Sequence, residues 1–218
     1  MLLDADDCQL VLMDYQTRLM PVMFESELVL TNAVRLARMS HIMQVPVWCT
    51  VQTPGKLGPS VPALQAALDA AGGRTLDKAH FSAVAEGLGD WLRPPARKLQ
   101  PAAPALPVRG NARSLPKHLQ RPPQQQAQED EPGPNTIVIA GCEAHVCLLQ
   151  TALDLLEEEF EVWVVTDACS SRSERNRDAA FDRLAGNGAE LVTTEMVAFE
   201  WLRTAQHPAF RDLLACVK

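Results

Sequence analysis

The sequence predicts an α/β fold in which helices cover both faces of a largely parallel sheet. Three observations support this prediction. Short apolar runs alternate with longer segments whose apolar residues recur at helical spacing, as expected of βαβ units. Polar residues suited to chemistry follow directly after the apolar runs, where ligands bind to parallel sheets. The 218 residues are 47% hydrophobic and 22% charged, which is the composition of a folded globular chain.

The first half of the chain contains two expected strands. Residues 9–13 (QLVLM) form a continuous apolar run, typical of a strand buried on both faces. Residues 45–51 (VPVWCTV) form the second, and Pro46 marks its start because proline occurs mainly at strand beginnings or edges. Between them we expect a helix over 26–43, with the Ser26 hydroxyl as a candidate cap. A Gly/Pro-rich loop over 53–62 follows, and then two further helix candidates, 61–71 and 83–92.

The second half repeats the alternation. It begins with residues 136–140 (TIVIA), the clearest strand in the chain. Glycines after the longest helix candidate act as stop signals. The expected elements are a helix over 146–159, a strand over 161–166, a helix over 173–186, a strand over 190–193 and a helix over 195–205.

The segment 94–134 interrupts this pattern. Ten of the 16 prolines fall in it, it contains no Phe, Trp or Tyr, and it carries six basic residues against three acidic ones. Such a composition buries too little apolar surface to offset the entropy lost on ordering. We therefore expect one domain over residues 1–218 with a loop or disordered insert at 94–134. A lid or a partner-binding tail is the alternative, because long loops are sometimes functional.

Charge and hydropathy narrow the class of protein. A net charge of -7 argues against a nucleic-acid partner, since binders of the phosphate backbone usually have a basic excess. No run of about 18 apolar residues is present, so we expect no membrane-spanning helix. Residues 1–7 carry three acids and no base, unlike a signal peptide. Six cysteines at scattered spacing then indicate reduced thiols, and we expect a cytoplasmic location.

Two residues at strand ends are candidates for chemistry. Asp14 directly follows the first apolar run, at the rim of the expected sheet, with a capping or surface carboxylate as the alternative. Cys147 begins a helix after the strand 136–140, where helix N–H groups favour an anion, so we expect a lowered pKa and a nucleophilic thiolate. The alternative for Cys147 is a buried structural thiol. The other five cysteines lie in or beside apolar runs and are interpreted as core residues.

On position alone, a solvated surface lysine is the default interpretation of Lys78, although its sequence context is apolar, and His80 and His145 are similarly ambiguous. No pair of histidines has zinc-like spacing, and no CxxC is present. The sequence also lacks a Walker motif and a GxGxxG turn. We therefore expect no metal and no cofactor, and a dinucleotide-binding Rossmann enzyme is set aside.

Four short blocks follow one another along the chain: LVLMDYQ at 10–16, DKAHFS at 77–82, GCEAHVC at 141–147 with TALDL at 151–155, and TDACSSR at 166–172. In this order they resemble the blocks of the isochorismatase-like cysteine hydrolases. The resemblance spans nearly the whole chain outside the insert. Two further blocks, GPSVP at 58–62 and the segment 167–173, are similar to the branch that contains the eukaryotic isochorismatase-domain proteins.

The resemblance implies a three-layer α/β/α Rossmann-like fold with six mostly parallel strands and a catalytic triad of Asp14, Lys78 and Cys147. In this scheme the Lys78 ammonium stabilises the Cys147 thiolate. Asp14 takes the thiol proton and later returns it to the leaving group. The thiolate attacks a small amide or related carbonyl substrate and gives a covalent intermediate that water hydrolyses.

The resemblance also implies an oxyanion hole made of the backbone N–H groups of Glu143 and Cys147. It further implies a cis peptide bond between Cys142 and Glu143. Placement after the strands adds four expected residues of the substrate pocket: Tyr15, Gln52, Phe81 and His145.

Departures from related activities narrow the expectation. Nicotinamidases of the superfamily carry a histidine-containing metal site after the second strand, whereas residues 49–56 (CTVQTPGK) have no histidine. Retention of Cys147 favours acyl or amide chemistry over the vinyl-ether hydrolysis of true isochorismatases. Family members are usually homo-oligomers, and we expect the same here. The competing hypothesis is a catalytically idle member that uses the fold for binding or assembly.

Overall fold

The computed structural model describes residues 1–93 and 134–218. Six strands form one parallel sheet in the order β3-β2-β1-β4-β5-β6. The predicted insert, 94–134, lies outside the described residues except for Pro134. The strands are β1 (Cys8–Met13), β2 (Val47–Gln52), β3 (Arg74–Lys78), β4 (Thr136–Gly141), β5 (Glu161–Val165) and β6 (Glu190–Val192).

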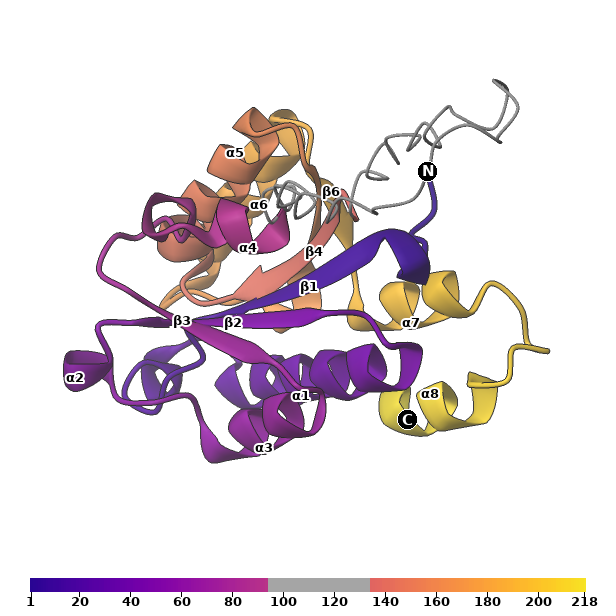
Figure 1. Cartoon of the computed structure of the whole chain (residues 1–218). Helices are drawn as coiled ribbons and strands as arrows, with labels where there is room; N and C mark the ends of the chain where they lie inside the picture. The colour runs from indigo at the N-terminus through magenta and orange to yellow at the C-terminus, as the bar shows by residue number, and fades with distance from the viewer. Residues whose placement is uncertain (94–133) are drawn as a thin grey trace, which may run out of the picture.

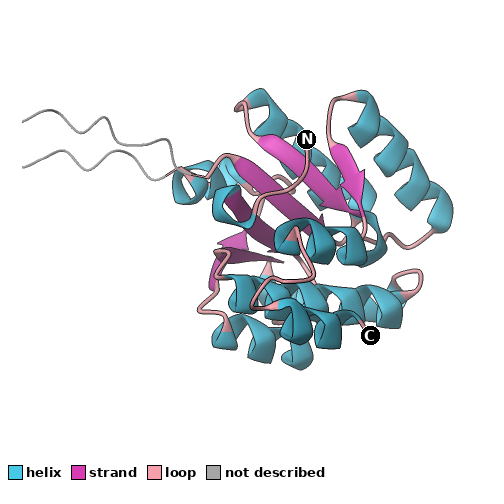
Figure 2. Ribbon diagram, turned by 90° about the vertical axis from the view of Figure 1, so that its right-hand side faces the viewer, coloured by secondary structure: helices cyan, strands magenta, loops and turns pink. Residues whose placement is uncertain are grey.

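Helices cover both faces of this sheet. The helices are α1 (Ser26–Met43), α2 (Pro54–Leu57), α3 (Pro62–Ala70), α4 (Leu88–Leu92), α5 (Leu149–Glu157), α6 (Glu174–Gly186), α7 (Thr194–Leu202) and α8 (Phe210–Val217). Helices α1, α3, α7 and α8 lie on one face, and α4, α5 and α6 lie on the other (Figure 1). A view turned by 90° shows the strands between the two helical layers (Figure 2). The predicted three-layer α/β/α architecture is confirmed.

The centre of the sheet is apolar on both faces. Every residue of β1 and β4 is buried, as expected of strands covered by helices on both sides. Met13, the last residue of β1, pairs with Thr50 of β2 and Gly141 of β4. A Cβ atom at Gly141 would lie 2.5 Å from the Met13 Cβ and 2.6 Å from its carbonyl oxygen, so only glycine fits there. The carboxyl ends of the three strands are therefore packed tightly together.

Three elements of the structure were not predicted, and one of them is α2, a four-residue helix inside the predicted loop over 53–62. Strand β3 is at the edge of the sheet and mostly exposed, so it lacks the apolar run that marks a buried strand. Helix α8 lies beyond the last predicted helix and packs against α1 and α7. The predicted helix over 83–92 is divided by Gly87, whose φ of 89° ends a 3₁₀ turn before α4 begins.

Helix caps differ from the prediction at one place. Helix α1 begins at Ser26, but its N-cap residue is Glu25 in the left-handed region, without a side-chain cap. Ser26 as the cap is therefore wrong. Helices α6 and α7 do have side-chain caps, since the hydroxyls of Ser173 and Thr193 accept from N–H groups of the first turn. Of the described residues, no helix combines the length and the apolar character needed to cross a membrane.

Candidate active site

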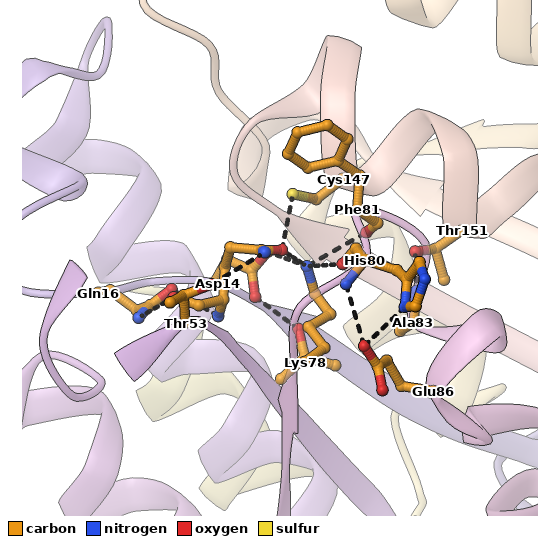
Figure 3. A network of polar contacts seen from close by, with 12 residues as sticks. Asp14, Gln16, Thr53, Lys78, His80, Phe81, Ala83, Glu86, Cys147 and Thr151 are labelled. Atoms are coloured by element: carbon orange, nitrogen blue, oxygen red, sulfur yellow. Dashed lines mark hydrogen bonds and ion pairs between the residues drawn. The ribbon is translucent and has the colours of Figure 1, made fainter. Parts of the chain in front are cut away.

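The three residues of the expected triad meet at the carboxyl end of the sheet (Figure 3). Asp14 follows β1 and Lys78 ends β3, two strands that flank β2. Cys147 lies on the other side, in a π-helical turn over residues 144–148 that leads from β4 into α5. The parallel arrangement explains the convergence, because the carboxyl ends of all the strands meet at one edge.

Asp14 and Lys78 form a buried ion pair. Asp14 Oδ2 lies 2.8 Å from Lys78 Nζ, and both side chains are fully buried. The Thr50 hydroxyl donates to the other carboxylate oxygen, Oδ1, at 2.8 Å, and the Asp14 N–H donates to the Thr50 carbonyl at 3.0 Å. The Lys78 ammonium is the charged partner of Oδ2, and a carboxylate oxygen has a second lone pair that can accept a proton.

The Lys78 ammonium is surrounded by oxygen atoms. Besides Asp14, it contacts the Gln52 Oε1 at 2.5 Å, the Phe81 carbonyl at 3.1 Å and the His80 carbonyl at 3.4 Å. A buried cation needs such partners because desolvation is otherwise very costly. Four oxygen acceptors therefore surround the three N–H donors of the ammonium group and hold the Lys78 side chain in place.

Gln52 connects the lysine with the cysteine. Its Oε1 accepts from Lys78 and lies 3.9 Å from Cys147 Sγ. Its Nε2 donates to the Ala79 carbonyl at 2.7 Å, and its backbone N–H donates to the Gln16 Oε1 at 2.8 Å. Both ends of the Gln52 carboxamide are therefore engaged, and the side chain has one fixed orientation.

The Cys147 thiol is protonated in this arrangement. Its side chain is nearly buried, with 6% exposed. Burial raises the pKa of the Cys147 thiol to about 12, and the neighbouring Asp14 carboxylate contributes to this rise, while Lys78 opposes it. The predicted lowered pKa is therefore wrong for the protein without substrate. Helix position alone indicated a thiolate, but desolvation and a nearby negative charge outweigh it.

The turn before Cys147 contains a backbone donor without a backbone acceptor in the described part of the chain, the Glu143 N–H. The Cys142–Glu143 peptide bond is cis, as the sequence resemblance implied. The carbonyl of Glu143 accepts from the N–H groups of Val146 and Leu148, whereas its own N–H has no backbone acceptor among the described residues. The Glu143 side chain pairs with Arg172 Nε at 2.8 Å, which holds the turn from outside.

Three of the four expected pocket residues lie near the triad, and the fourth, Tyr15, does not. Gln52 and Phe81 lie beside Lys78, and the Phe81 side chain is 53% exposed. His145 lies in the same turn as Cys147, and its Nδ1 is 2.9 Å from the Ser171 hydroxyl. Tyr15 does not join this group, because it is completely buried and its hydroxyl donates to the Ala168 carbonyl at 2.6 Å. Tyr15 is a core residue in this structure.

Several residues that hold the site were missed by the sequence interpretation. Thr50 orients Asp14, and Glu86 accepts from the loop after Lys78. Thr50 lies inside a predicted strand and Glu86 inside a predicted helix, so neither stands out by position. The structure shows no cluster of three or more potential metal ligands within residues 1–93 and 134–218.

The chain is similar to a known protein family. A family model described as the isochorismatase domain matches residues 124–196. The isochorismatase domain-containing protein 2 of Rattus norvegicus is 31% identical over 209 residues, or 96% of this chain and 80% of the relative. The protein of the same name from Danio rerio is 31% identical over 204 residues, covering 94% and 83%.

Solved structures share the fold. A structure titled MAR1 ribonuclease from Caenorhabditis elegans superposes with a TM-score of 0.78 at 26% identity, covering 100% of this chain and 92% of that one. The YcaC product of Escherichia coli, titled an octameric hydrolase of unknown specificity, gives 0.71 at 23%, covering 99% and 96%. YcaC from Pseudomonas aeruginosa, titled as carrying covalent acrylamide, gives 0.73 at 22%, covering 99% and 91%.

Proposed function

This chain belongs to the isochorismatase-domain family, and from that premise we propose that it is a cysteine-dependent hydrolase of a small amide or related carbonyl compound. Cys147 is the nucleophile, Asp14 the proton acceptor and Lys78 the cation that stabilises negative charge. No metal or cofactor takes part in the proposed reaction.

One observation supports this proposal above all others. Asp14 Oδ2 is buried and pairs with the Lys78 ammonium at 2.8 Å. Buried ion pairs are costly to form, and buried ionisable groups beside a thiol are typical of functional sites. The same carboxylate raises the pKa of the Cys147 thiol, so the two groups interact directly. Asp14 Oδ2 is therefore the atom that accepts the thiol proton in this proposal.

In the first half of the reaction, the Cys147 sulfur attacks the carbonyl carbon of the substrate as its proton moves to Asp14 Oδ2. The transfer accompanies the attack, because the thiol with a pKa of about 12 is not ionised beforehand. The C=O π pair moves to oxygen, and the N–H groups of Glu143 and Cys147 stabilise the oxyanion. The oxyanion then re-forms the C=O bond, the C–N bond breaks, Asp14 protonates the leaving amine, and a thioester of Cys147 remains.

In the second half, Asp14 takes a proton from water as the water oxygen attacks the thioester carbonyl. Collapse of this intermediate breaks the C–S bond and releases the acid, and the proton on Asp14 returns to sulfur. Lys78 takes no part in the proton transfers and keeps its contacts with the Asp14, Gln52 and Phe81 oxygens. The cycle consumes one water and regenerates the thiol.

The substrate enters beside Phe81 and His145. The Phe81 side chain is exposed next to the lysine, and the His145 ring is only partly buried. Gln52 holds Lys78 and contacts the thiol, so it borders the reacting atoms rather than the outer pocket. An aromatic ring and an imidazole at the entrance suit a small, partly apolar compound.

The second candidate is a catalytically idle protein that uses the fold for binding or assembly, because the raised pKa of the Cys147 thiol opposes its ionisation. A nuclease is a third class, since a relative is titled a ribonuclease. The net charge of -7 does not favour binding of a polyanion. A short RNA in the substrate panel tests this class directly.

Hydrolysis of a panel of small carboxamides by the wild type and by Cys147→Ala tests the proposal. Cys216→Ala on α8 is the matched control, because it also removes a thiol but lies outside the site. We expect at least one carboxamide to be hydrolysed, the activity to vanish in Cys147→Ala, and the control to retain it. Activity that survives Cys147→Ala refutes the mechanism, and inactivity of the wild type on every compound favours the idle fold.

We also propose a homo-oligomer, as in the octameric neighbour. Sedimentation velocity at micromolar concentration measures the mass of the particle. A particle of one chain, 23.9 kDa, would refute this part of the proposal.

A further inference from the structure

A short irregular segment supplies several of the oxygen atoms around Lys78. We call residues 79–83, which follow β3, the lysine loop. Its carbonyl groups accept from the site: Ala79 from Gln52 Nε2 at 2.7 Å, Phe81 from Lys78 Nζ at 3.1 Å and His80 from the same nitrogen at 3.4 Å. The position of Lys78 therefore depends on a stretch without helix or strand hydrogen bonds.

One carboxylate holds the start of this loop. Glu86 Oε1 accepts from the backbone N–H of Ala79 at 2.8 Å and from that of His80 at 3.0 Å. The His80 Nδ1 lies 2.8 Å from the same oxygen. These bonds lower the pKa of Glu86 to about 2, so the carboxylate is charged at any ordinary pH. The N–H groups of Ala79 and His80 point to Glu86, while the carbonyl groups of His80 and Phe81 accept from Lys78 on the other side (Figure 3).

The end of the loop is tied to the helix that follows the nucleophile. The Ser82 hydroxyl donates to the Asp154 carboxylate, and the Ala83 N–H donates to the Thr151 hydroxyl at 2.9 Å. Both acceptors are on α5, whose preceding turn carries Cys147. The end of the loop is thus fixed by the nucleophile helix, and its start is fixed by Glu86.

We propose that Glu86 is a positioning residue for the reaction: it fixes the lysine loop so that the His80 and Phe81 carbonyls keep Lys78 beside Asp14 and Cys147. This inference rests on the proposed function. Glu86 itself touches neither the thiol nor Lys78, so its effect passes through the loop backbone.

The consequence follows from the bonds that would be lost. Without the carboxylate, two backbone N–H groups lose their acceptor, and the start of the loop relaxes toward water. The His80 and Phe81 carbonyl groups then move, and Lys78 loses part of the oxygen contacts that hold it. Because Lys78 lowers the pKa of Cys147, a displaced ammonium lets that pKa rise further.

The test compares Glu86→Ala and Glu86→Gln with Glu157→Ala. In Glu86→Gln the side-chain carbonyl oxygen can still accept both backbone N–H bonds, so this variant separates loop anchoring from charge. Glu157 is exposed at the end of α5 and serves as the matched control. The readout is the rate of Cys147 alkylation by iodoacetamide between pH 8 and 10, located by peptide mass mapping, with thermal melts to verify folding.

We expect Glu86→Ala to alkylate Cys147 about 3- to 10-fold more slowly than the wild type at each pH, a rise of about half to one pKa unit. Glu86→Gln should lie between the two, and Glu157→Ala should match the wild type. With a carboxamide that the wild type hydrolyses, kcat should fall more than KM rises. Alkylation in folded Glu86→Ala at the wild-type rate overturns the inference.

The two proposals fail in different ways. Hydrolysis that survives Cys147→Ala refutes the proposed function, whereas the alkylation rates still report whether Glu86 acts on the thiol through Lys78. A variant that loses only thermal stability, with an unchanged alkylation profile, shows that Glu86 is merely structural and overturns the inference.

Discussion

Replacement of Asp14 by asparagine separates two roles of this carboxylate. Asp14 is proposed to accept the thiol proton, yet its charge also raises the pKa of Cys147. The Asp14→Asn variant keeps an Oδ1 acceptor for the Thr50 hydroxyl, but it removes the charge that faces Lys78. The thiol should then become more acidic, because the opposing negative charge disappears and the lysine charge is no longer neutralised. Hydrolysis should be lost, because no group remains to take the proton.

The magnitude follows from the wild-type pKa of about 12. At pH 9 a thiol with this pKa is ionised in about one molecule in a thousand. Two unit charges 4 Å apart interact by about 4 kcal/mol at an effective dielectric constant of about 20, or about 3 pKa units as an upper bound. Since burial is the largest cause and stays, we expect a fall of about one to two units and alkylation about 10- to 100-fold faster at pH 9.

The assay is iodoacetamide alkylation at pH 9 followed by peptide mass mapping of Cys147. Loss of one partner of a buried ion pair costs about 3–5 kcal/mol, so a thermal melt must first show that Asp14→Asn is folded. Asp90→Asn on α4 is the control for the same chemical change outside the site. Equal or slower alkylation of Cys147 in folded Asp14→Asn would refute the reasoning, because it would mean that the carboxylate does not oppose thiol ionisation.

Three further predictions concern the scaffold around the site. Gly141→Ala should lower the stability by about 1–3 kcal/mol, measured by urea unfolding, because its Cβ would overlap Met13; an unchanged midpoint would contradict the close approach. Tyr15→Phe should lower the free energy of unfolding by about 1–3 kcal/mol, because the Ala168 carbonyl loses a buried donor. The variant should keep its activity per folded molecule, and a selective loss of activity would instead place Tyr15 at the substrate. The pKa of the Glu86 carboxylate is lowered to about 2, so its contribution to stability should be complete above about pH 4.5 and lost as the pH falls toward 2. The stabilities of the wild type and Glu86→Gln should therefore become equal in acid. A difference in stability that stays constant with pH would exclude this linkage.

The sequence predicted the fold well where burial is strong. Strands β1, β2, β4 and β5 are apolar runs, and their order with the intervening helices indicates a parallel sheet. Strand β3, which carries Lys78, was not predicted, because an edge strand needs no apolar run. Lys78 was nevertheless found through its sequence block, since that resemblance does not depend on assigning a strand.

The chemistry of the site was harder to predict than its members. A helix N-terminus favours a thiolate, but the sequence does not reveal how deeply Cys147 is buried or that Asp14 lies beside it. These two long-range effects reverse the sign of the pKa shift. Tyr15 illustrates the same limit, because a residue next to Asp14 in the sequence can point into the core. Glu86 contacts the lysine loop through backbone hydrogen bonds that leave no motif in the sequence.

The most direct test of the central claim is the mass of the protein during turnover. A carboxamide from the active panel is mixed with the wild type, the reaction is quenched in acid, and the adduct is located by peptide mapping. The mechanism predicts an added acyl group on Cys147, in a thioester that hydroxylamine removes, and no adduct in Cys147→Ala. Turnover by the wild type without any acyl adduct, or an adduct on Cys142 instead, would contradict the account.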